Sequence, residues 1–160
     1  MIRMNWVSGY RKLFVFPILF LALSCARSHH VGPSMVQLCF DDERGIDELI
    51  GVLEKIASDN FLGFVDRSSG IQRELRTLGM DPGYRVIGIS ATREDGVGLA
   101  AGNLSLGPYQ AVVGFTQGAD AEASEAFAKD AIATLEAKWK LRAVASGQGA
   151  FKLPDCGLGG

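Results

Sequence analysis

The segment "YRVIGISATREDGVGLAAGNLSLGPYQAVVGFTQ", Tyr84–Gln117, carries the pattern that decides the fold. Its two ends, "YRVIGISATRE" and "YQAVVGFTQ", are rich in β-branched and aromatic residues, which is typical of strands. The dipeptide Asp95-Gly96 follows the first end and favours the tight turn of a β-hairpin. The stretch after this turn, residues 97–105, is either a further strand or a glycine-containing loop. This part of the chain therefore predicts successive antiparallel strands.

The sequence on either side alternates between strand and helix patterns. Met35–Phe40 has the side chains of a strand, and apolar residues at helical spacing then continue to about Ser58. After the central segment, Asp120 is a good first residue for a long helix that runs to about Trp139. Residues 141–145 are predicted to form the last strand.

A shorter helix is predicted between the first long helix and the central segment. Ser69 and Gln72 stand at capping-box spacing, and Gly79 is a suitable residue to end this helix. The resulting order predicts an α+β fold with a mostly antiparallel sheet and two main helices on one face. This is a two-layer sandwich of the ferredoxin-like βαββαβ type, or a variant with an extra strand and a short helix. In that topology the first and last strands are neighbours.

The N-terminal segment has the layout of a secretory signal. Arg3, Arg11 and Lys12 precede an uncharged apolar run, Leu13–Leu23, which is too short to cross a bilayer as a helix. We therefore expect a signal peptide over residues 1–24, a tether over residues 25–35 and a single α+β domain over residues 36–160.

The end of this signal, Ala22-Leu23-Ser24-Cys25, resembles the lipobox of bacterial lipoproteins. The resemblance covers the first 25 residues and implies that Cys25 receives a diacylglyceryl group and becomes the N-terminus. It also implies a lipid-anchored protein of the bacterial cell envelope that faces the periplasm. In the enterobacterial pattern of that family, a residue other than Asp after the cysteine, here Ala26, implies the outer membrane and not the inner one. Ordinary signal cleavage is the alternative, since Ala22-Leu23-Ser24 also fits the small-x-small rule.

The number of cysteines favours lipidation. If Cys25 carries lipid, Cys39 and Cys156 remain in the domain and can form a disulfide in an oxidising compartment. If it does not, an odd thiol is left over. The alternative for Cys39 and Cys156 is two separate buried thiols.

Charge and residue types restrict the function. The chain has 16 Lys and Arg and 18 Asp and Glu. The signal holds three of the basic residues and no acidic one, so the rest of the chain has 13 basic and 18 acidic residues, a net charge of about −5. Binding to nucleic acid is not expected, because it requires a basic surface. The two histidines, His29 and His30, lie in the tether, which leaves the domain without the usual general base or zinc ligands.

No cofactor, metal or catalytic residue is therefore expected. The acidic groups at Asp41–Glu43 and Glu94–Asp95 lie where a helix start and a turn are predicted. The favoured function is a non-enzymatic binding or scaffolding lipoprotein, held at the membrane by its acylated cysteine and bound to another envelope protein. One alternative is an immunity-type inhibitor that neutralises a secreted toxin in the periplasm. Another is an enzyme of unrecognised type.

Overall fold

The computed structural model describes residues 35–145, 148–154 and 156, so Cys25 and the predicted signal peptide lie outside the described residues. Its elements in chain order are β1 (Met35–Cys39), α1 (Arg44–Asp59), β2 (Gly63–Asp66), α2 (Ser68–Thr77), β3 (Gly88–Thr92), β4 (Gly98–Gly102), β5 (Gln110–Thr116), α3 (Ala121–Glu136) and β6 (Leu141–Ala143).

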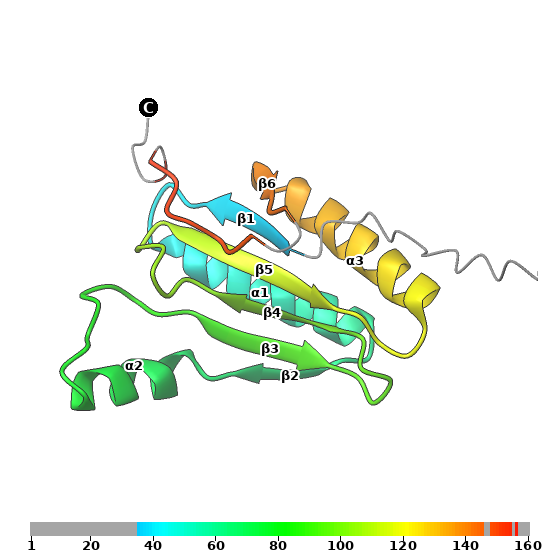
Figure 1. The fold of residues 1–160 in the computed structure, drawn as a ribbon, viewed down its shortest axis with the longest axis horizontal. Helices are drawn as coiled ribbons and strands as arrows, with labels where there is room; N and C mark the ends of the chain where they lie inside the picture. Colours follow the sequence, from blue (N-terminus) through cyan, green and yellow to red (C-terminus); the bar gives the residue numbers. More distant parts are fainter. Residues whose placement is uncertain (1–34, 146–147, 155, 157–160) are drawn as a thin grey trace, which may run out of the picture.

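The strands form one sheet in the order β2-β3-β4-β5-β1-β6, and every neighbouring pair is antiparallel (Figure 1). The predicted α+β sandwich is confirmed, and the first and last strands are neighbours. The order β4-β5-β1-β6 is that of the ferredoxin-like arrangement, and β2 and β3 extend this sheet at one edge. The open question about residues 97–105 is also answered, because Gly98–Gly102 forms the strand β4.

Strand β2 has no counterpart in the sequence prediction. It has four residues, of which only Phe64 is even half-buried. An edge strand that buries so little has no alternation of apolar and polar residues from which to predict it.

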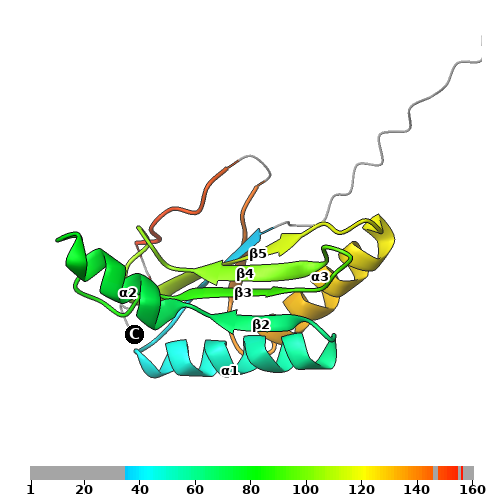
Figure 2. The same cartoon turned by 90° about the horizontal axis from the view of Figure 1, so that it is seen from below.

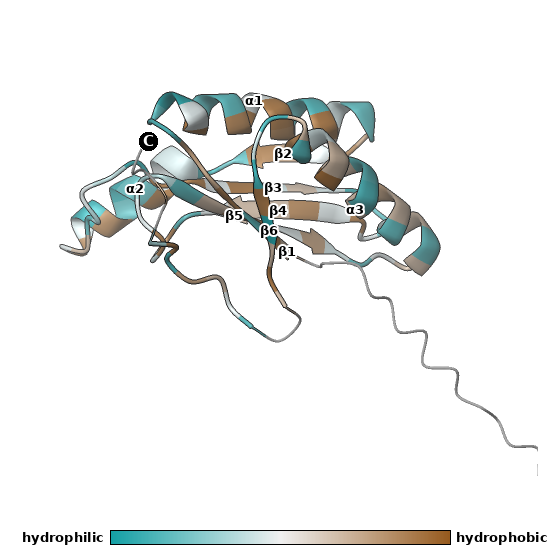
Figure 3. Ribbon diagram, turned by 90° about the horizontal axis from the view of Figure 1, so that it is seen from above, coloured by the Kyte–Doolittle hydropathy of each residue, from teal (hydrophilic) through white to brown (hydrophobic). Residues whose placement is uncertain are grey.

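The helices α1 and α3 cover the same face of the sheet, and the main core lies beneath them (Figure 2). Figure 3 shows the apolar side of α1 turned towards the strands and its polar side turned outwards. On this face Phe115 of β5 meets Phe127 of α3 edge to face, with ring centres 6.2 Å apart. The core joins both helices to all of the first five strands: Val36, Leu38, Leu49, Leu53, Ile89, Leu99, Ala111, Val113, Phe127, Ala131 and Leu135 are among its buried residues, and half-buried Phe64 packs against it.

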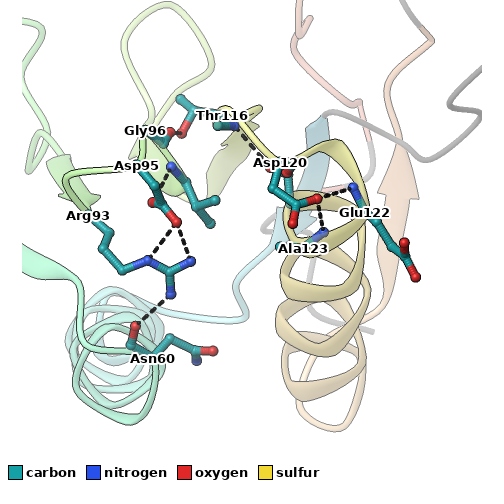
Figure 4. Close-up of polar contacts among 11 residues, drawn as sticks. Asn60, Arg93, Asp95, Gly96, Thr116, Asp120, Glu122 and Ala123 are labelled. Carbon is teal, nitrogen blue, oxygen red and sulfur yellow. Dashed lines mark hydrogen bonds and ion pairs between the residues drawn. The ribbon is translucent and has the colours of Figure 1, made fainter.

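The helix starts agree with the prediction in one case and differ in another. Asp120 caps α3 as predicted, because its carboxylate accepts from the N–H groups of Glu122 and Ala123 at 2.9 and 3.1 Å (Figure 4). The predicted capping box of α2 is wrong. The Gln72 side chain instead accepts from the Val86 N–H at 2.8 Å, because the chain preceding β3 passes beside α2 and offers this N–H.

The face of the sheet opposite α1 and α3, here called the open face, is partly covered by the end of the chain. The C-terminal strap, defined as residues 148–154 and Cys156, crosses this face over β1 and β5 (Figure 1). A disulfide joins Cys39 of β1 to Cys156, with Cα atoms 5.2 Å apart. This is the pairing that was expected if Cys25 carries lipid.

Candidate functional site

The first acidic group, at Asp41–Glu43, lies directly before α1 and contacts its first residue through Asp42. The Asp42 carboxylate forms an ion pair with Arg44 and accepts from the main-chain N–H of the same residue at 2.8 Å. The Arg44 side chain is the main cause that lowers the pKa of Asp42. This carboxylate is therefore held as an exposed anion and is engaged in local structure.

The second acidic group, at Glu94–Asp95, organises the hairpin between β3 and β4 (Figure 4). Arg93 contacts the Asp95 carboxylate at 2.6 Å and lowers its pKa, and the same carboxylate accepts from the Val97 N–H at 3.1 Å. Arg93 also donates to the main-chain oxygen of Asn60, beyond the last residue of α1, at 3.4 Å. The two acidic groups thus lie near opposite ends of α1, a helix of about 24 Å, and they do not act on one reacting centre.

A shallow polar depression of about 390 Å³ lies between α2, the chain that leads into β3 and the start of α1. It is lined by Glu43, Gln72, Arg76, Asp81, Gly83, Tyr84 and Arg85. Its two arginines are already paired: Arg76 contacts Asp81 at 2.8 Å, and Arg85 contacts Asp47 of α1 at 2.7 Å. The Gly83 N–H and then Arg76 lower the pKa of Asp81. The first pair joins α2 to its own loop and the second joins the chain before β3 to α1, so both arginines already take part in structural ion pairs.

Within the described ranges, no group of three or more His, Cys, Asp or Glu side chains is arranged to bind a metal ion. His29 and His30 lie outside those ranges. The glycines of residues 96–103 belong to the β3–β4 hairpin and to β4, so they do not open a helix as a dinucleotide loop does. No helix in the same described ranges has the length and apolar content needed to cross a membrane.

The feature that sequence reasoning missed is Phe61, at the end of α1. Phe61 has a φ of +57°, in the left-handed region that favours glycine. Its N–H donates to the Ser58 oxygen at 3.2 Å, and the Leu62 N–H donates to the Ala57 oxygen at 2.8 Å. These two bonds define a Schellman motif, in which Phe61 takes the position that glycine usually occupies.

The side chain of Phe61 gains nothing from the fold in return. It is 86% exposed, whereas Leu62, the next residue, is buried in the core. A bulky residue therefore carries both a backbone cost and an exposed aromatic ring at one place. A sequence signal was present, because the predicted helix ends at about Ser58 and no glycine follows before Gly63, although a helix stop favours glycine.

Phe61 leads directly into β2, which is an unpaired edge of the sheet (Figure 1). The Arg67 N–H donates to the Gly88 oxygen, so Arg67 is bonded to β3. In an antiparallel ladder every second residue bonds to the neighbouring strand, so the N–H and C=O groups of Phe64 and Asp66 point away from β3. No other described strand pairs with that side of β2. Val65, in the same strand, is 49% exposed. We call Phe61 and residues 63–66 the β2 edge.

Comparisons of this chain with protein-family models, with curated proteins and with solved structures find no significant match.

Proposed function

We propose that this protein is a non-enzymatic lipoprotein of the bacterial envelope, anchored through Cys25, whose domain binds another envelope protein at the β2 edge. The observation that carries the binding role is Phe61, which holds a left-handed backbone and an exposed ring two residues before an edge strand whose outer side is unpaired. Costly local features that bring no gain in stability are characteristic of functional surfaces.

The chemistry of the β2 edge indicates the kind of partner. The outward N–H and C=O groups of Phe64 and Asp66 fit an added strand, which pairs with an edge through main-chain hydrogen bonds. Exposed apolar side chains at Phe61 and Val65 then give the contact its buried area. The partner would therefore offer an extended segment with an apolar side chain next to it.

The anchor is tested separately from the binding role. The expected result is that the wild type is found in the membrane fraction with an acylated Cys25 at its N-terminus, and that Cys25→Ala is not. Mass spectrometry of the N-terminal peptide provides the readout. A wild-type protein that is released into the soluble fraction and has no acyl mass would refute the anchor and leave the β2 edge untouched.

The binding role is tested with a photo-crosslinking amino acid placed at position 61 in cells. A matched control carries it at Lys129, which is exposed on α3. We expect a discrete crosslinked product from position 61 that is absent from position 129, and we expect an Asp66→Pro change in the same strand to reduce it. Identical products from both positions would contradict a specific contact at the β2 edge.

A further inference from the structure

Two glutamines on the open face are almost completely buried. Gln37 of β1 is 1% exposed and Gln110 of β5 is 2% exposed. In β1, Gln37 lies between Val36 and Leu38, which belong to the core, so its side chain projects to the open face. The C-terminal strap buries both amides, which are bonded to each other through Gln37 Nε2 and Gln110 Oε1 at 2.9 Å. We call these two side chains the amide slot.

The amide slot recognises the main chain of the strap. Gln110 donates to the Leu153 oxygen at 3.0 Å and accepts from the Leu153 N–H at 2.8 Å. Gln37 donates to the Phe151 oxygen at 2.8 Å. Contacts at residues 151 and 153, with the residue between them skipped, are the pattern of an extended segment.

Two side chains of the strap are turned away from this contact, whereas Leu153 is half-buried. Phe151 is 48% exposed and lies against the Arg142 guanidinium, 4.8 Å from the centre of its ring, and Lys152 is exposed. Main-chain groups are common to all peptides, so the slot is suited to extended segments of other sequences.

The strap does not satisfy every group in the slot. Gln37 Oε1 is buried and has no hydrogen-bond partner among the described residues. Its orientation is set by Nε2, because both partners of that nitrogen are acceptor oxygens. A buried acceptor without a donor is unfavourable, and a different extended segment that supplies an N–H to this oxygen would satisfy it.

The disulfide holds the strap in the slot. Cys39 lies two residues after Gln37 in β1 and is the register partner of Gln110 in β5, so it belongs to the same face. Its bond to Cys156 closes the strap over both amides. The bond keeps Cys156 next to β1, so the end of the strap stays beside the slot.

We propose that the amide slot is a binding site for the main chain of an extended peptide, filled in cis by the C-terminal strap and opened when a dithiol reduces the Cys39–Cys156 disulfide. A thiolate of the dithiol attacks one cysteine sulfur, the other cysteine leaves as a thiolate, and the second thiol of the reductant resolves the mixed disulfide. Two electrons and two protons pass to the two cysteines, and the dithiol becomes a disulfide. The slot lies on β1 and β5, away from the β2 edge, so this proposal does not depend on the proposed function.

The test uses the purified protein and a synthetic peptide of residues 148–154, QGAFKLP, as the probe. The readout is the NMR signals of the Gln37 and Gln110 side-chain amides. After disulfide opening, the strap remains tethered and competes at an effective concentration in the millimolar range, so the peptide is added to about 5 mM. We expect these signals to shift in Cys156→Ser and in dithiothreitol-reduced wild type, with an affinity at least tenfold higher than for the oxidised wild type.

Two altered peptides separate recognition of the main chain from recognition of side chains. Leu153→Pro removes the N–H that donates to Gln110 and should abolish binding of the peptide. Leu153→Ala keeps this N–H and should still bind. In the protein, Gln110→Leu added to Cys156→Ser should also abolish binding. Loss of binding with the Leu153→Ala peptide, or no shift in either reduced form, would overturn the proposal. Unfolding of both reduced forms would overturn it as well, because the disulfide would then support the whole fold.

Discussion

Replacing Phe61 with glycine should stabilise the protein. The left-handed backbone at φ +57° costs a residue with a side chain about 1–2 kcal/mol, and glycine does not have this cost. Glycine has more conformational entropy than phenylalanine in the unfolded chain, which offsets about 0.5–1 kcal/mol of this stabilisation. The ring is 86% exposed, so its removal takes little buried apolar area away from the folded state. The expected net effect is a rise of about 0.5–1 kcal/mol in the free energy of unfolding, or about 2–4 °C in Tm.

The matched control is Phe61→Ala, which removes the ring and keeps the left-handed cost. Its stability should remain within about 0.5 kcal/mol of the wild type. Urea unfolding with the disulfide intact, followed by circular dichroism, measures the stability of both variants. The two curves are fitted with one common slope for the dependence of the free energy of unfolding on urea concentration. If Phe61→Gly is no more stable than Phe61→Ala, the backbone argument is wrong. Both variants should lose the partner of the β2 edge, so that stability and binding change in opposite directions in the glycine variant.

Three further predictions concern the fold. Asp120→Ala should lower the free energy of unfolding by about 1 kcal/mol, measured by urea denaturation, because two N–H groups of α3 lose their acceptor. Gly98→Ala should lower the free energy of unfolding by about 1–3 kcal/mol, because the added Cβ would lie 2.2 Å from a main-chain oxygen. Gly88→Ala should lower Tm less, because the added Cβ meets the end of a flexible side chain, and equal falls in Tm would contradict this. Arg85 lowers the pKa of Asp47, so their pair stabilises the fold above about pH 4 and is lost as pH falls through the lowered pKa. Asp47→Asn should therefore flatten the fall in Tm below about pH 4.

The position of most elements follows from short patterns in the sequence. The hairpin turn at Asp95-Gly96 and the cap at Asp120 are confirmed, because both depend on groups within three residues of each other. The long helices also end close to the predicted residues. Strand β2 and the role of the Gln72 side chain at α2 could not be predicted in this way. Gln72 bonds to a main-chain group 14 residues away, and β2 is defined by its pairing with β3.

The candidate surfaces depend on the tertiary structure to a greater degree. The sequence alone places Phe61 after a helix, because the helix follows from local periodicity. It also indicates that Cys39 and Cys156 can pair, once the lipobox resemblance sets Cys25 aside. Only the fold decides that β2 is an edge, because strand order depends on contacts between distant segments. Likewise, Gln37 and Gln110 are buried because a segment up to 114 residues away in the chain lies over them. Burial of a polar side chain on the second face of a sheet is set by that distant partner, and no pattern within the strand itself encodes it.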